Sequence, residues 1–334
     1  MLLTLRRALV GLLIATPGFA DTHDAAAPGR QAALLAEAVA AFDSYELAKA
    51  GQLLDGLEQQ SGRSATLLYY RTRILTLRNR ADAALKVAQQ CIAAYPQASR
   101  CHEALADARI TAAFASGKTL DIVSGARAAK DSWEKALALD PANARAGLLL
   151  VRYNRQAPWP LGSASRAREL ERQIASHDAA AGAQAQGLNL LSDKNYPAAV
   201  AALRRAIALQ PGDRDARFYL VTTYLAAKQY REAAAAGEDM ITRYPKFWIA
   251  WFTLGYLHFD GKLDPNRGIV AMRTFLANAE RPPPQQRSAA LACIGTFEER
   301  LGHVDAARSA FQQALALNGD DKNAKEGLAR LPRG

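Results

Sequence analysis

The chain has 334 residues, of which 50% are hydrophobic and 22% are charged, and its formal net charge is +10. This balance is typical of a folded globular protein and excludes a disordered or collagen-like chain. The sequence is rich in alanine, the residue with the highest helix propensity, which argues against an all-β sandwich or barrel. The length suits two domains or one elongated array.

The first twenty residues have the layout of a secretory signal peptide. Residues 1–7 carry two positive charges, residues 8–15 form a short apolar run, and small residues precede Ala20. We expect cleavage after Ala20, export to the periplasm, and a disordered leader over residues 21–29. The apolar run is too short to span a bilayer and no later run reaches about twenty residues, so we expect no stable membrane insertion.

Three cysteines would enter this oxidising compartment, and an odd number leaves at least one thiol unpaired. Cys91 and Cys101 flank an expected turn around Pro96, so a disulfide between them is possible. The simpler expectation is that all three cysteines, including Cys293, are buried as small apolar side chains.

Prolines recur behind Ala-rich apolar segments with a period of about 34 residues, a spacing typical of repeat arrays. Pro245 follows Pro211 by one such period, and Pro211 follows Pro141 by slightly more than two. Residues 251–255 read WFTLG, and tyrosines stand three residues before several small residues of the expected second helices. Those small residues are Ala48, Ala84, Ala129, Ala199, Ala233 and Ala307.

These residues resemble the tetratricopeptide repeat, a unit of about 34 residues that reads W-x2-L-G-x2-Y, then A-x3-F, then P. The whole resembles exported bacterial proteins built of degenerate repeats of this kind. The resemblance implies an all-α fold, a right-handed superhelical solenoid of about eight antiparallel helix pairs with a C-terminal capping helix. The expected pairs are 30–59, 65–96, 98–140, 142–177, 180–211, 214–245, 248–279 and 285–318, with the cap at 321–331. Residues 116–124 and 157–162 depart from the repeat, and insertions in solenoids form loops that often lie on a binding face.

The sequence indicates no enzyme, no cofactor and no metal site. Residues 116–119 read SGKT like the end of a phosphate-binding loop, but Ala112 replaces a required glycine and a helix is expected upstream. The five histidines and three cysteines lack metal-ligand spacing. Glu103 and Asp107, spaced i and i+4 on one helix, are interpreted as a solvated face. Basic residues are scattered, which argues against nucleic-acid binding.

Two functions remain open at this stage. The first is a scaffold that docks a peptide or helix of another envelope protein in its concave groove. The second is an accessory subunit that binds a small ligand or glycan for an envelope transport or export system. A structural spacer is a third possibility, and the oligomeric state is unknown.

The concave face of a tetratricopeptide array is lined by the first helix of each pair. The resemblance therefore implies a groove that is cationic in its middle and aromatic toward its C-terminal half. Arginine binds carboxylates in bidentate fashion, so the expected ligand is an acidic peptide with an apolar anchor. The alternative is that these side chains only pack between helices and form salt bridges. The predicted groove residues are Tyr69, Arg73, Arg145, Arg152, Arg155, Phe218, Phe252, Tyr256 and Phe259.

Overall fold

The structure, a computed structural model, describes residues 29–277 and 282–332, which contain seventeen α-helices and no strand. The predicted signal peptide and residues 21–28 of the predicted leader lie outside the described residues, while Gly29 opens the first described helix. The described residues form two compact units that divide between Ala216 and Arg217. The prediction of an all-α fold of paired helices is confirmed.

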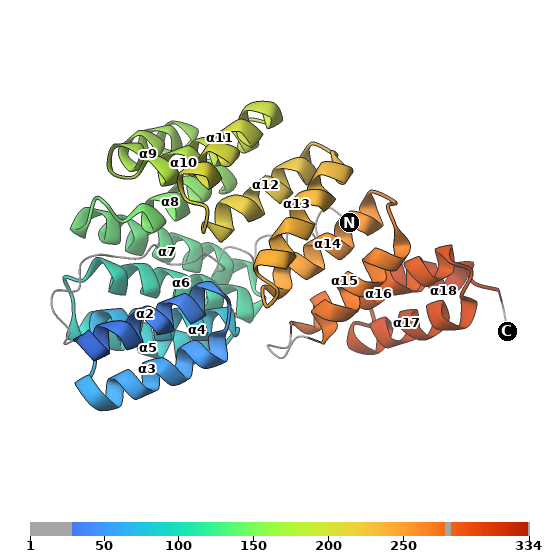
Figure 1. The fold of residues 1–334 in the computed structure, drawn as a ribbon, viewed down its shortest axis with the longest axis horizontal. Helices are drawn as coiled ribbons and strands as arrows, with labels where there is room; N and C mark the ends of the chain where they lie inside the picture. Colours follow the sequence, from blue (N-terminus) through green and yellow to red (C-terminus); the bar gives the residue numbers. More distant parts are fainter. Residues whose placement is uncertain (1–28, 278–281, 333–334) are drawn as a thin grey trace. The chain divides into compact units, whose positions relative to one another are not determined.

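Unit 1 contains five complete helix pairs and the start of a sixth (Figure 1). In each complete pair the two helices pack against each other, and α4 with α6 and α8 with α10 also bring neighbouring first helices together. The helices are α2 (Gly29–Asp43), α3 (Leu47–Ser61), α4 (Ala65–Leu77), α5 (Ala81–Ala94), α6 (Ser99–Ser116), α7 (Thr119–Leu139), α8 (Ala144–Gln156), α9 (Ala164–His177), α10 (Ala179–Ser192), α11 (Tyr196–Leu209) and α12 (Arg214–Ala226), which continues into unit 2.

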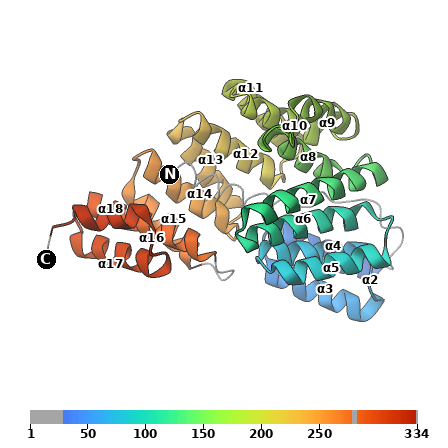
Figure 2. The same cartoon turned by 180° about the vertical axis from the view of Figure 1, so that it is seen from behind.

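Unit 2 continues the same architecture and ends on a single helix. Helices α14 and α15, and α16 and α17, pack as pairs, and α18 covers both α16 and α17 (Figure 2). The helices are α13 (Tyr230–Arg243), α14 (Trp248–Asp260), α15 (Pro265–Leu276), α16 (Pro284–Arg300), α17 (Val304–Leu317) and α18 (Lys322–Arg330).

Small residues let these helices approach closely, as the end of unit 2 shows. The Phe311 ring of α17 is fully buried between Gly295 of α16 and Gly327 of α18. A Cβ added to Gly295 would lie 2.6 Å from this ring, and one added to Gly327 would lie 2.3 Å from it. Any side chain at either glycine would displace the ring, which explains why these helix positions hold glycine despite its low helix propensity.

The turn inside five of the helix pairs repeats one backbone conformation. Tyr45, Asn79, Lys194, Lys228 and Lys262 all have φ between +49° and +63°, the left-handed region. Each stands just after the first helix of its pair, where a left-handed residue ends the helix and reverses the chain. Non-glycine residues therefore make this turn in five of the pairs, which is why glycine spacing alone does not reveal the repeat.

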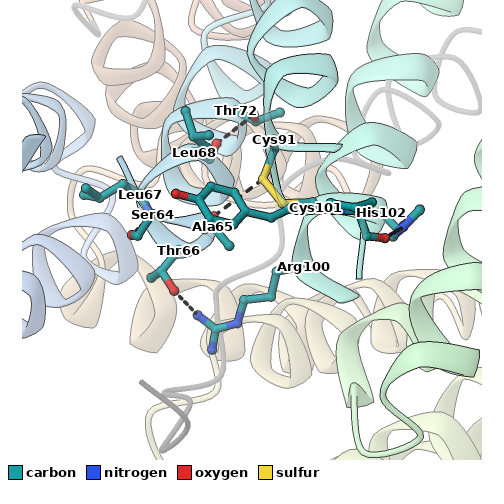
Figure 3. Close-up of a disulfide and its surroundings, with 12 residues drawn as sticks. Ser64, Ala65, Thr66, Leu67, Leu68, Thr72, Cys91, Arg100, Cys101 and His102 are labelled. Atoms are coloured by element: carbon teal, nitrogen blue, oxygen red, sulfur yellow. Dashed lines mark hydrogen bonds between the residues drawn. A yellow bond between two sulfur atoms is a disulfide. The ribbon is translucent and has the colours of Figure 1, made fainter. Parts of the chain in front are cut away.

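A disulfide joins Cys91 on α5 to Cys101 on α6 (Figure 3). Both residues are fully buried beside Leu68, and the Cys91 sulfur lies 3.7 Å from the carbonyl oxygen of Ala65. The expectation that all three cysteines are free thiols is therefore wrong for this pair, because the turn around Pro96 brings the two Cα atoms to 5.3 Å. Cys293 is free and buried.

The first departure from the repeat is only partly a loop. Residues 117–118 form a short connection, and the helix α7 then begins at Thr119 and runs for 21 residues. The expected loop over residues 116–124 is therefore wrong beyond residue 118, because the inserted residues lengthen the second helix of the pair. Residues 157–163, the second departure, do connect α8 to α9 without helical structure.

Candidate functional site

The predicted groove residues all lie on first helices, and they differ in how far they are exposed. Tyr69 and Arg73 are on α4, and Arg145, Arg152 and Arg155 are on α8. All of these except Arg155 are buried. Phe218 lies on α12, and the other three aromatic residues lie on α14. Only the α14 residues are partly exposed, along with Arg155.

Five side chains of unit 1 form a buried cluster, named here the inner ion cluster: Tyr69, Arg73, Glu103, Asp107 and Arg145. The Arg145 guanidinium donates one hydrogen bond to a Glu103 carboxylate oxygen and a second, of 2.6 Å, to Asp107 Oδ2. The Tyr69 hydroxyl donates to Glu103 Oε1 at 2.8 Å and accepts from Arg73 Nη1 at 3.0 Å. Three consecutive first helices, α4, α6 and α8, are thus connected through charged groups in the interior.

The opposite charges in the inner ion cluster reduce the free-energy cost of burying one another. Burial opposes ionisation of Glu103, but Arg145 and Arg73 outweigh that cost and hold its pKa below the ordinary value. Burial dominates at Asp107 and raises its pKa, although Arg145 and Arg73 oppose the shift. Burial also raises the pKa of the Tyr69 hydroxyl well above its ordinary value. Arg145 itself is desolvated, yet Asp107 and Glu103 keep its pKa raised. In a low-dielectric interior, each charge in this cluster depends on its partners.

The interpretation of Glu103 and Asp107 as a solvated face is wrong. The two residues are 2% and 1% exposed, because Arg145 on the next first helix supplies the opposite charge that their burial requires. The repeat period could have found them. Glu103 follows Tyr69 by one period, and Asp107 follows Arg73 by one period, so they occupy the same stripe one repeat later.

Arg155 and Arg152 complete the cationic part of the prediction. Arg155 pairs with Asp193, the residue that ends α10, and Arg168 Nη2 lies 3.1 Å from the same carboxylate. Burial disfavours the ionised form of Asp193, but the hydrogen bonds from Arg155 and Arg168 outweigh this effect and lower its pKa. Arg152 is buried.

A second long-range contact lies at the end of unit 1. The Arg214 side chain at the start of α12 is fully buried, and its Nη1 donates to the carbonyl oxygen of Asp43 at 3.1 Å, across 171 residues of sequence. Its guanidinium also lies 5.2 Å from the centre of the Tyr45 ring. Within unit 1 the first helix pair is therefore in contact with the start of the sixth, and no spacing in the sequence signalled this contact.

The aromatic part of the prediction falls on α14. Phe252, Tyr256 and Phe259 are each half-buried and follow one side of this helix together with Trp248 and Trp251. These five residues are named here the α14 aromatic stripe. Its rings rest on the core of unit 2, with the Phe252 ring 4.9 Å from that of Phe275 and the Phe259 ring 6.2 Å from that of Phe297.

The five residues of the stripe pack against the core of unit 2, as the packing interpretation expects, and all five are also partly accessible to solvent. Phe218 differs, since it is buried against Phe247 with the ring centres 5.9 Å apart. Contact of any predicted groove residue with a partner remains a prediction.

The described residues show two further absences. In residues 29–277 and 282–332, no three His, Cys, Asp or Glu side chains come together in a group that could hold a metal ion. Within the same ranges, no helix is both long and apolar enough to cross a membrane.

The comparisons with known proteins agree with this architecture. A family model described as tetratricopeptide repeat matches residues 190–257, which include α11 to α13. No curated protein matches the sequence. Among solved structures, the Cut9–Hcn1 hetero-tetramer of the APC/C matches with a TM-score of 0.60 and 13% identity over 89% of this chain. The chain spans 55% of the length of that protein.

Two bacterial structures show the same resemblance at lower scores. A tetratricopeptide-repeat protein from Parabacteroides merdae is 14% identical over 90% of this chain and 97% of its own, with a TM-score of 0.39. A thermophilic protein of this type from Thermus thermophilus is 16% identical over 68% of this chain and 98% of its own, with a TM-score of 0.40. Residues 190–257 thus match the tetratricopeptide-repeat model, and the all-α fold of the chain is similar to that of the Cut9–Hcn1 structure.

Proposed function

We propose that this protein is a non-enzymatic scaffold of the cell envelope that binds a peptide or helix of a partner protein. Tetratricopeptide-repeat folds generally serve as scaffolds for protein–protein interaction and are generally not catalytic. The finer parts of the proposal are the docking surface, the chemistry of the partner and the compartment.

The observation that carries the docking surface is the partial exposure of the α14 aromatic stripe. Tyrosine, tryptophan and phenylalanine dominate the binding energy of protein interfaces, and rings that are already held by a core lose little conformational entropy on binding. The buried groove residues of unit 1 contrast with the stripe, since Arg145 already bonds two carboxylates of its own chain. We therefore assign the contact with the partner to the α14 aromatic stripe.

The partner that fits has an apolar anchor and an acidic character. An apolar side chain of the partner would cover the parts of Phe252 and Tyr256 that the core of unit 2 leaves exposed. The formal net charge of +10 favours an acidic segment on approach.

The envelope location is supported by the disulfide between Cys91 and Cys101. Structural disulfides persist in oxidising compartments such as the bacterial periplasm and are rare in the cytosol. We expect the exported protein to begin at Asp21, after cleavage behind Ala20. N-terminal sequencing of protein recovered from the periplasmic fraction checks this, and a mature chain that begins at Met1 would contradict it.

The docking surface is tested once a partner is identified by crosslinking in the envelope, purification of the mature chain and mass spectrometry. We expect Tyr256→Ala to weaken binding of that partner by roughly tenfold or more, which corresponds to about 1.4 kcal/mol. Tyr196→Ala is the matched control, because Tyr196 is also half-buried but lies on α11 of unit 1. Binding at full strength by a folded Tyr256→Ala variant would refute the assignment of the docking surface to the α14 aromatic stripe. A purified chain that carries a small ligand or glycan and no protein would favour the accessory-subunit alternative.

A further inference from the structure

Exposed apolar side chains gather at one end of two neighbouring helix pairs. Among the described residues, five large apolar side chains are exposed, and three of them lie in the two segments that depart from the repeat. Leu120 is 84% exposed and Val123 is 37% exposed in the first turns of α7, and Trp159 is 89% exposed in the connection from α8 to α9. The other two, Leu209 and Val270, stand alone on α11 and α15.

The topology of unit 1 places the two segments at the same edge. Helix α7 packs against both α6 and α8, and α8 runs back along α7 after a short turn. The 21 residues of α7 span about 31 Å and the 13 residues of α8 span about 20 Å, so the first two turns of α7 extend past the end of α8. Tyr153, near the end of α8, lies within electrostatic range of Lys130 and Arg127 of α7, as this alignment requires. The projecting start of α7 and the connection after α8 therefore lie at one edge, named here the Trp159 edge (residues 116–127 and 157–168).

Basic residues surround these apolar side chains. The Trp159 edge contains four basic residues, Lys118, Arg127, Arg166 and Arg168, and a single acidic one, Asp121. Lys118, Arg127 and Arg168 are exposed and Arg166 is partly so, but Arg166 pairs with Glu169 and Arg168 with Asp193, so the cationic character of the edge depends on Lys118 and Arg127. Cations beside exposed tryptophan and leucine are the combination that holds proteins at anionic bilayer surfaces, where tryptophan occupies the headgroup level.

The distribution of the apolar side chains favours lipid over a protein. Stable protein interfaces need about 800 Å² on each partner with a packed apolar centre. On the Trp159 edge, exposed polar residues such as Lys118 and Asp121 stand between the apolar ones, and Pro158 and Pro160 flank Trp159 in a short connection. Apolar side chains that are separated by polar ones can each enter a fluid bilayer surface, because the lipids rearrange around each of them.

We propose that the Trp159 edge binds the surface of an anionic lipid bilayer. Trp159 and Leu120 enter the interface, and Lys118 and Arg127 face the acidic headgroups. This association is peripheral and reversible, and it is independent of the α14 aromatic stripe, which lies in unit 2.

The test is vesicle flotation with the full mature chain. Vesicles of phosphatidylcholine containing about one quarter phosphatidylglycerol are compared with pure phosphatidylcholine at low and high salt. We expect binding to the anionic vesicles only, weakened by salt, and reduced by about tenfold or more in the double variant Trp159→Ser with Leu120→Ser. The matched control is Leu209→Ser with Val270→Ser, which removes two exposed apolar side chains elsewhere and should bind like the wild type.

Tryptophan fluorescence gives an independent readout. The chain has four tryptophans, of which Trp133 is buried and Trp248 and Trp251 are half-buried. A blue shift on adding anionic vesicles should therefore disappear in Trp159→Phe. Absence of flotation, or equal loss in the test and control variants, overturns the proposal. If the wild type binds no vesicles but an envelope protein binds it and not the double variant, the edge is a protein interface instead.

Discussion

Arg145→Met is expected to lower the free energy of unfolding by about 3–5 kcal/mol, because it leaves Glu103 and Asp107 buried without their main counter-charge. Chemical unfolding at neutral pH, followed by circular dichroism, measures this loss. Arg155→Met is the matched control. Its partner Asp193 is about one-third exposed and keeps Arg168 as a second partner, so we expect a clearly smaller cost than for Arg145→Met.

Two further variants separate the lost charge from the lost packing. If unpaired carboxylates cause the loss, the triple variant with Glu103→Gln and Asp107→Asn should recover much of the stability, since it contains no uncompensated buried charge. Equal effects of Arg145→Met and Arg155→Met would show that the inner ion cluster does not hold the charges described above.

Unit 1 is expected to lose stability as the pH rises from about 4 to about 8, through Asp215. Burial raises the pKa of this carboxyl group to about 8, although Arg214, Arg145 and Arg73 favour its charged form; neighbouring Asp213 adds to the rise. In the unfolded chain an aspartate titrates near its ordinary pKa of about 3.9. Between these two values the folded state holds a proton that the unfolded state has released. The stabilisation from the proton on Asp215 is therefore complete below about pH 4 and is lost as the pH approaches 8. Over this range the free energy of unfolding falls by up to about 1.4 kcal/mol per pH unit.

Asp215→Asn should remove this dependence, because an amide stays neutral throughout. We expect the variant to be more stable than the wild type at pH 8 and similar to it near pH 4, as measured by denaturant midpoints across this range. Asp121→Asn, at an exposed position on α7, is the control and should follow the wild-type profile. The same profile for Asp215→Asn and the wild type would mean that this carboxyl group is ionised in the folded chain.

The fold class could be predicted from the sequence because the solenoid repeats its chemistry. The spacing of Pro211 and Pro245, the small residues of the second helices and the WFTLG segment all report one local unit, and stacking of such units needs no long-range information. The same phase also placed Tyr69 and Arg73 on the first helix of the second pair, and both lie on α4 with buried side chains.

What the sequence could not show was which inner side chains are covered. The repeat period places Glu103 and Asp107 on the same stripe as Tyr69 and Arg73, but it does not show that Arg145 reaches both, because the lengthened α7 between α6 and α8 breaks the period. The contact of Arg214 with Asp43 depends on how five successive pairs stack, which no local pattern records. The half-exposure of Phe252 and Tyr256 likewise depends on α15 and α16, which cover one side of their rings.

The disulfide between Cys91 and Cys101 crosses the junction between two successive repeats, since α5 closes one pair and α6 opens the next. A stacked array frays from its ends, because a terminal unit has a neighbour on one side only. The covalent link ties the end of the second pair to the start of the third, and the hydrogen bond from Tyr69 to Glu103 spans the same junction. The disulfide leaves out the first pair, α2 and α3, which is held instead by packing and by the contact of Arg214 with Asp43 and Tyr45, so under protease attack it can separate once that contact opens, without any covalent bond breaking.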